Sequence, residues 1–175
     1  ADTSKGVGGG LFGLFGVGAP AAPPAAPPPG PALPPQQKEL VALESKRLGN
    51  RVHSLFGGGK YREALQVAEE QMKLLKDAYG TSHHEYATSM NNVATLFQAL
   101  GRYTEAEPLL LEASKIQQRT LGNDHPHTVA SLSNLATVYD AMGQAERAAA
   151  MQSLVSAMKK TWEEKNAQKM AQKRR

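Results

Sequence analysis

A repeat of 42 residues is the feature that most constrains the fold of this chain. Glycine occurs at positions 59, 101 and 143, and asparagine recurs at the same interval at positions 50, 92 and 134. A fixed period of this length is typical of an array in which copies of one supersecondary unit stack on each other. The chain is therefore predicted to form three stacked units, which offer a binding surface without specifying what is bound.

Each unit reads as two amphipathic helices joined by a tight turn. In the second unit, apolar residues lie at helical spacing over 87–100 and again over 103–116, with Gly101 between the two runs. This periodicity predicts an α-helical hairpin. We therefore expect an all-α fold of six helices. The units are expected at about 36–79, 80–121 and 122–157.

The units differ in the regularity of their entrances and turns. Pro126 suits the first turn of a helix, and Asp124 or His125 is placed to cap the free amides of that turn. In the first unit, Gly49 lies inside the first helix and glycine fills positions 57–59. Because glycine weakens helices and loosens turns, we expect this unit to be the softest of the three.

The net charge of +4 is confined to the C-terminus. Residues 36–157 carry 12 Lys and Arg against 13 Asp and Glu, whereas residues 158–175 carry seven basic residues against two acidic ones. Any electrostatic contact with RNA or an acidic partner would therefore come from this tail. A solvated helical cap and a nuclear localisation signal are the other interpretations. The basic residues are Lys159, Lys160, Lys165, Lys169, Lys173, Arg174 and Arg175.

Residues 1–35 form a separate arm rich in Gly, Pro and Ala, with nine of the eleven prolines. This composition favours an extended polyproline II spacer over a packed core. A short apolar segment within the arm is predicted to anchor the chain on another subunit. A ligand for an SH3 or WW domain, a nuclear-pore-type Phe-Gly segment and plain disorder are the alternatives. The anchor residues are Leu11, Phe12, Leu14 and Phe15.

The compartment is suggested by the N-terminus. The chain starts at Ala1 and continues into a spacer-like arm, as is common in organellar proteins after removal of a transit peptide. We therefore expect the interior of a mitochondrion or chloroplast, with a location peripheral to a membrane complex as one version and the cytoplasm as the alternative. The sequence contains no run of 18 or more apolar residues, so no transmembrane segment is predicted. Cysteine is absent, which excludes disulfides and thiolate sites.

The residues around each turn resemble the tetratricopeptide repeat. In every unit a small residue stands seven positions before the turn glycine, a large one four before it, and an alanine five after it. The runs at 101–110 and 121–126 are similar to the 42-residue repeats of kinesin light chains. The resemblance implies three tandem helix-turn-helix hairpins in a short right-handed superhelix, followed by a long basic C-terminal helix. Ala145 and Gln152 depart from the pattern, so no further repeat is expected behind the third hairpin.

In this family the first helices of the hairpins line a concave groove that holds peptides or helices. The resemblance implies that the repeated Asn grips a ligand backbone, with bracing of neighbouring helices as the alternative. Lys46 is the one lysine there, so a clamp for the terminal carboxylates of chaperone tails is not expected. The implied groove residues are Lys46, Asn50, His53, Thr88, Asn91, Asn92, Thr95, Gln98, Ser133, Asn134, Thr137 and Asp140.

No catalytic constellation or cofactor motif is visible in the sequence. Histidines at 83–84 and at 125 and 127 recur at unit entrances, where helix structure explains them better than a metal site does. We predict a non-catalytic scaffold without cofactor, metal or small-molecule substrate, acting as an accessory subunit of a large organellar complex. A ribosome- or RNA-associated protein that uses the basic tail, and a cytosolic peptide-binding adaptor, are the alternatives.

Overall fold

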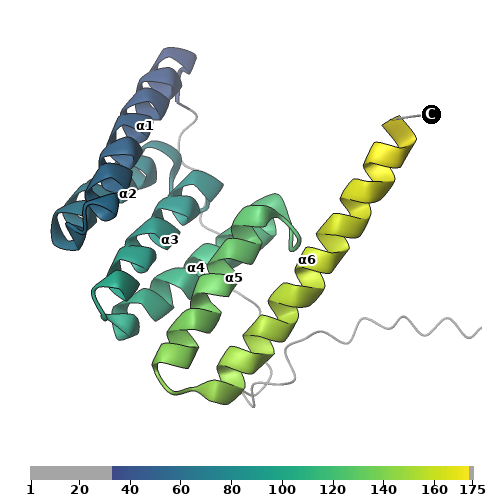
Figure 1. Cartoon of the computed structure of the whole chain (residues 1–175). Coiled ribbons are helices and arrows are strands. Elements are labelled where there is room, and N and C mark those ends of the chain that lie inside the picture. Colours follow the sequence, from purple (N-terminus) through teal and green to yellow (C-terminus); the bar gives the residue numbers. More distant parts are fainter. Residues whose placement is uncertain (1–32, 174–175) are drawn as a thin grey trace, which may run out of the picture.

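The structure is a computed structural model that describes residues 33–173 of the chain. This part contains six α-helices and no β-strand, which confirms the prediction of an all-α fold. The helices form three hairpins, α1–α2, α3–α4 and α5–α6, that stack side by side (Figure 1). Their bounds are α1 (Pro35–Gly57), α2 (Tyr61–Tyr79), α3 (His84–Ala99), α4 (Tyr103–Leu121), α5 (Pro126–Ala141) and α6 (Ala145–Lys173).

The turn inside each hairpin has the same backbone geometry. Gly59, Gly101 and Gly143 have φ values of 73°, 72° and 74°, in the left-handed region that glycine adopts without strain. The N–H of the next residue donates to the carbonyl five residues earlier, at 2.8 or 2.9 Å, which closes the end of the helix. The first turn follows this pattern despite its two extra glycines.

Histidines cap the first helices of the second and third hairpins. Nδ1 of His83 and of His125 accepts a hydrogen bond from the backbone N–H two residues further on, at 3.2 Å in both cases. An N-cap of this kind satisfies one of the free amides of the first turn. Of the two residues predicted as caps of α5, His125 takes this position, whereas Asp124 pairs with Lys165.

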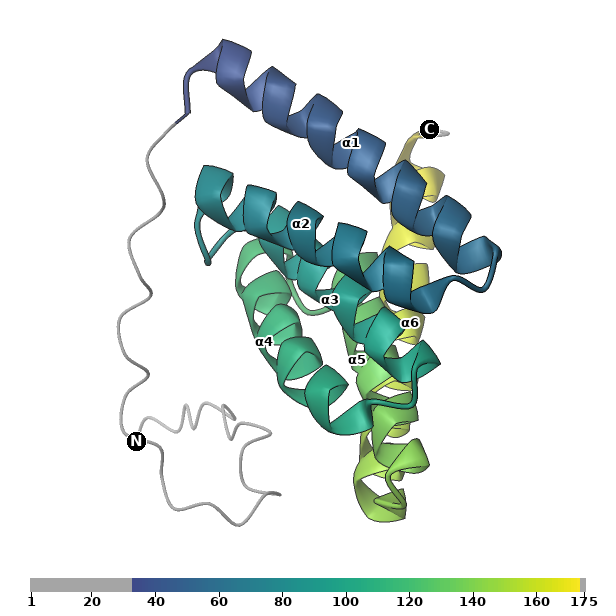
Figure 2. The same cartoon turned by 90° about the vertical axis from the view of Figure 1, so that its left-hand side faces the viewer.

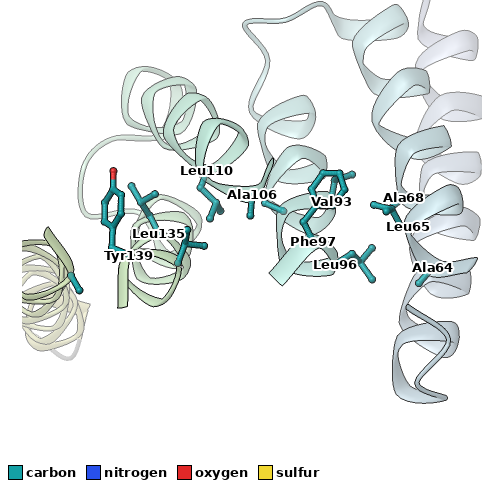
Figure 3. Close-up of a cluster of buried hydrophobic side chains, with 13 residues drawn as sticks. Ala64, Leu65, Ala68, Val93, Leu96, Phe97, Ala106, Leu110, Leu135 and Tyr139 are labelled. Carbon is teal, nitrogen blue, oxygen red and sulfur yellow. The ribbon is translucent and has the colours of Figure 1, made fainter. Parts of the chain in front are cut away.

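One apolar core connects the three hairpins. Each helix packs on the next along the chain, and α3 also contacts α5; Figure 2 shows α1 and α2 lying over α3 and α4. The side chains in Figure 3 include Leu65 of α2, Phe97 of α3, Leu110 of α4 and Leu135 of α5, all buried in a single cluster. Because this cluster crosses every boundary between hairpins, the units form one packed body.

The N-terminal edge of the array is polar. Leu135 and Val138 of α5 are buried in the core. The residues two repeats earlier are Arg51 and Ser54 of α1, and both are exposed. Helix α5 packs on the hairpin before it through its apolar side chains. The polar side chains at the same positions of α1 suit a surface that faces water.

The C-terminal edge is polar as well. Ala68 and Leu110 are buried where one hairpin meets the next. The corresponding residue of the third hairpin is Gln152, which is exposed, as the sequence pattern suggested. Helix α6 continues through position 157 without a break as far as Lys173, and its C-terminal half extends past the other helices (Figure 1).

Candidate functional site

The residues predicted for the groove all lie on the first helices of the hairpins. Two positions recur in all three sets, Asn50, Asn92 and Asn134 at one and His53, Thr95 and Thr137 at the other. Helix α1 carries Lys46, Asn50 and His53; α3 carries Thr88, Asn91, Asn92, Thr95 and Gln98; α5 carries Ser133, Asn134, Thr137 and Asp140.

In the second and third hairpins, part of this set is used to hold α3 and α5 together. The amide nitrogen Nδ2 of Asn134 donates to Oδ1 of Asn91 at 3.0 Å and to Oγ1 of Thr95 at 3.3 Å. Nε2 of Gln98 donates to the backbone carbonyl of Asn134 at 3.0 Å. Asn134 therefore braces two helices, which was the alternative interpretation of the repeated Asn.

The other two members of the Asn series are differently placed. Asn50 is exposed and Asn92 is half-buried. Within residues 33–173, neither side-chain amide makes a hydrogen bond. Each amide can donate and accept at once. The side-chain amides of Asn50 and Asn92 are therefore available to a ligand, whereas the amide nitrogen of Asn134 is already hydrogen-bonded inside the array.

A hollow of about 360 Å³ opens next to Asn50, between α1, α2 and the start of α3. We call it the first-hairpin hollow. Two of its residues, Lys46 and Asn50, were predicted for the groove, and the rest were not. The lining residues are Ala42, Ser45, Lys46, Gly49, Asn50, Gln71, Leu75, Tyr79 and Glu85.

A polar pair lies beside this hollow. Nε2 of the buried Gln71 donates to the carbonyl of Ser45 at 2.8 Å and to its Oγ at 3.1 Å. Oε1 of Gln71 is buried with no hydrogen-bond partner among the described residues. A Cβ atom on Gly49 would lie 3.2 Å from Nε2 of Gln71. Glycine at 49 therefore makes room for the Gln71 amide.

The corresponding place in the second hairpin is occupied by side chains. Ala87 and Ala113 stand where the first hairpin has Ser45 and Gln71, and both are fully buried. The place of Gly49 is taken by Asn91, which binds Asn134. Gln117 adds a second bridge, because its Oε1 accepts a hydrogen bond from Ser131 of α5 at 2.7 Å.

The third hairpin has a hollow of about 530 Å³ between α5 and α6. Most of its residues stand two repeats after residues of the first-hairpin hollow, so the two hollows occupy equivalent positions. Among the described helices α6 is the last, and its Trp162 is 41% exposed. We call this the third-hairpin hollow; its lining residues are Asp124, Pro126, Val129, Ala130, Ser133, Asn134, Lys159, Trp162 and Glu163.

The predicted basic tail is part of α6 as far as Lys173. Nζ of Lys165 lies 2.5 Å from Oδ2 of Asp124, which ties α6 to the loop before α5. The hydrogen bond from Lys165, followed by one from the backbone of Asp124 itself, lowers the pKa of the Asp124 carboxyl below its usual value. Lys159 lines the third-hairpin hollow. Lys160, Lys169 and Lys173 are exposed, and Arg174 and Arg175 lie outside the described residues, as do Leu11, Phe12, Leu14 and Phe15.

The capping histidines titrate below their ordinary range. Burial, followed by the charge of His84, lowers the pKa of His83. Burial, followed by the charge of His127, lowers the pKa of His125. Both shifts favour the neutral imidazole, which is the form whose Nδ1 can accept the capping hydrogen bond. In the described part of the chain, no three His, Asp or Glu residues gather in a way that could hold a metal ion.

Sequence comparison identifies the family. A family model for the tetratricopeptide repeat matches residues 47–116 and, in a second overlapping match, residues 87–161. Together the two matches cover more than half of the chain. The chain belongs to the tetratricopeptide repeat family. Such arrays are scaffolds for protein–protein interaction.

Solved structures support the kinesin-light-chain-like type of tetratricopeptide array. BtubC (BKLC) from P. vanneervenii is 22% identical, with a TM-score of 0.64 over 69% of this chain and 48% of its own. A protein of Podosopora anserina, assigned as a kinesin light chain with nearly identical TPR-like repeats, is 27% identical with a TM-score of 0.55, over 69% of this chain and 63% of its own. A substituted form of that protein is 25% identical with a TM-score of 0.59, over 73% of this chain and 65% of its own.

This tetratricopeptide chain spans between about half and two thirds of the length of those proteins. No curated protein sequence matches it. Among the described helices, none combines the length and apolarity needed to span a membrane.

Several residues of the two hollows were missed in the sequence. Gln71 comes from α2, a second helix that the family pattern does not place in the groove. Glu85 lies in the first turn of α3, before the predicted groove positions, and Trp162 lies past the predicted end of the array. One signal was available for Trp162. It follows Val155 by seven residues, which extends the apolar face of α6 beyond residue 157.

Proposed function

We propose that this tetratricopeptide array holds a polypeptide segment of a partner subunit across α1 and α3, as a non-catalytic accessory subunit of a larger assembly. The observation that carries the proposal is the difference within the Asn series. Asn50, which lines the first-hairpin hollow, and Asn92 keep unused amides, whereas the amide of Asn134 is bonded within the array. Family membership supports the general role, because arrays of this kind are interaction scaffolds.

The chemistry of the site favours an extended segment that is close to neutral. Lys46 and Glu85 line the same hollow with opposite charges, so neither an acidic nor a basic segment is strongly preferred. Side-chain amides that donate and accept suit the alternating N–H and carbonyl groups of a ligand backbone. We therefore propose recognition through the backbone of the ligand, with the hollow receiving one of its side chains.

A second contact is proposed for the arm, through Leu11, Phe12, Leu14 and Phe15. These residues lie outside the described part of the chain, so the proposal rests on their apolar character and on the proline-rich spacer that follows them. Two contacts joined by a tether raise the effective concentration of each for the same partner. The expected organelle location and the contact of the tail with RNA stay predictions.

The test is affinity purification of the full chain from its native source with cross-linking, followed by binding measurements on the segment that is cross-linked to α1 or α3. We expect the double variant Asn50→Ala/Asn92→Ala to bind that segment at least tenfold more weakly, because about 1 kcal/mol is lost per hydrogen bond. Gln66→Ala removes an exposed amide of α2 and serves as the control. Recovery of the chain alone as a free monomer, or binding that ignores the double variant, would contradict the proposal.

A further inference from the structure

We propose that the C-terminal edge of the array, formed by α5 and α6, docks a helix from another protein in the position that α5 takes on the second hairpin. This surface is separate from the proposed groove on α1 and α3. The argument uses the repeat itself, because the contacts between the second hairpin and α5 show which groups a helix in this position would meet on the third.

Helix α5 is held on the second hairpin by three polar bridges. Ser131 donates to Gln117 of α4, Asn134 donates to Asn91 and Thr95 of α3, and Gln98 of α3 donates to the carbonyl of Asn134. One repeat further on, Gln117 becomes Lys159 of α6, and Asn91 and Thr95 become Ser133 and Thr137 of α5. Lys159 and Thr137 are exposed and Ser133 is half-buried. Gln98 becomes the exposed Asp140, which cannot donate to a carbonyl. Two of the three anchor points for a following helix are therefore present, one of them with a positive charge at Lys159.

The charge of Lys159 indicates what the partner carries at the place of Ser131. Of the acidic residues that line the same hollow, Asp124 is paired with Lys165, which leaves Glu163 as the opposing charge. In the place of the neutral Gln117, Lys159 offers an ammonium group, which prefers a carboxylate to the serine hydroxyl of α5. Ser133 and Thr137 carry hydroxyl groups, as Thr95 does, so an amide in the place of Asn134 would still find partners there. The docked helix should thus carry Asp or Glu where α5 has Ser131, and Asn or Gln three residues later.

Trp162 supplies the apolar part of the surface. It lines the third-hairpin hollow together with Val129 and Ala130 and is 41% exposed. Covering a large aromatic side chain is favourable, and aromatic residues are enriched at the centres of protein interfaces. The neighbouring Gln152 and Ser156 are exposed and polar, so the edge stays in water between binding events and favours an exchangeable partner.

A second copy of this chain fits the edge poorly. Its first helix, α1, would have to take the position of α5. The residue of α1 that corresponds to Ser131 is Arg47, which would face Lys159. The residue that corresponds to the buried Leu135 is Arg51. Like charges and a buried arginine both oppose such a stack, so the occupant is a different protein.

The test uses the intrinsic fluorescence of Trp162, the single tryptophan of the chain. The probes are two synthetic peptides with the sequence of residues 123–142, which contain no tryptophan, one with Ser131→Glu and one with Ser131→Lys. Each is titrated into the full chain. We expect the Glu peptide to shift the Trp162 emission to shorter wavelength in a saturable way, and the Lys peptide to bind roughly tenfold more weakly.

The variant Lys159→Glu supplies the matched control, because an exposed side chain can change charge without loss of the fold, which circular dichroism checks. We expect it to reverse the preference between the two peptides. No emission shift with either peptide, or equal binding of both by the two proteins, would overturn the proposal. So would a concentration-dependent shift of the chain alone, which would indicate a second copy. A shift to longer wavelength on replacing Leu11, Phe12, Leu14 and Phe15 by Ser would overturn it too, since the arm would then fill the hollow.

Discussion

The first and second hairpins have the same turns and helix pairing but use their polar residues differently. In the second, Ala87 and Ala113 pack closely, and Asn91 is bonded to the next hairpin. In the first, the buried amide of Gln71 and the small Gly49 leave a hollow. The comparison teaches that a repeat can keep its fold while one copy serves cohesion and another keeps polar groups for a ligand.

The largest expected effect tests whether the second hairpin contributes more to the stability of the array than the edge of the third does. Leu110→Ala should lower the free energy of unfolding by about 2–5 kcal/mol, because it removes a fully buried side chain and leaves a cavity. Gln152→Ala at the corresponding position of the third hairpin should change it by less than about 0.5 kcal/mol, since Gln152 is exposed. Urea unfolding of the two variants measures both values. Equal losses would mean that the C-terminal edge is covered by something else.

The next prediction separates the members of the Asn series. Asn134→Ala should cost about 1–3 kcal/mol, because it deletes a brace between α3 and α5 and strands the side chain of Asn91. Asn50→Ala should leave stability within about 0.5 kcal/mol, because its exposed amide makes no bond in the described chain. Thermal unfolding followed by circular dichroism ranks the variants. A large loss for Asn50→Ala would assign that residue a structural role and weaken the proposed function.

The features that the sequence predicted are set by residues close together along the chain, and those that it missed are contacts between different helices. The turn glycines, the helix pairs and the polar Gln152 all follow from spacing along the chain, so the repeat predicted them, and it narrowed the cap of α5 to Asp124 or His125. The contact of Gln71 with Ser45 and that of Asn134 with Asn91 join different helices. Those contacts depend on how closely the helices approach, which a period of 42 residues does not encode.

The same substitution in two hairpins tests the polar pair. Gln71→Met keeps the size of the side chain and removes the buried Oε1 that has no partner, but it also removes the hydrogen bonds of Nε2 to Ser45. The two effects oppose each other, so the free energy of unfolding should change by less than about 0.5 kcal/mol. Gln117→Met removes the acceptor of Ser131 and should destabilise the fold by about 1 kcal/mol. Guanidinium unfolding measures both variants. A loss with Gln71→Met as large as that with Gln117→Met would mean that the bonds to Ser45 outweigh the orphaned oxygen.

The smallest expected effect concerns the capping histidines, which the first hairpin lacks. Because the folded pKa values of His83 and His125 are lowered, their contribution to stability is present above the unfolded pKa of about 6.5 and is lost as the pH falls through the folded values. Between pH 7.5 and 5.5 the loss should stay below the roughly 1 kcal/mol of an N-cap. The double variant His83→Asn/His125→Asn keeps a cap that does not titrate. If its unfolding free energy falls with pH as steeply as that of the parent chain, other groups are responsible.

The length of α6 gives the array a lever. It has 29 residues, whereas α2 and α4 have 19 each, so it carries Lys173 about 15 Å past the level at which the other hairpins stop. The contact of Lys165 with Asp124 holds α6 where this extension begins. A small tilt of the third hairpin would thus produce a larger displacement at the far end of α6. A protein bound there would be moved by a change of packing inside the stack.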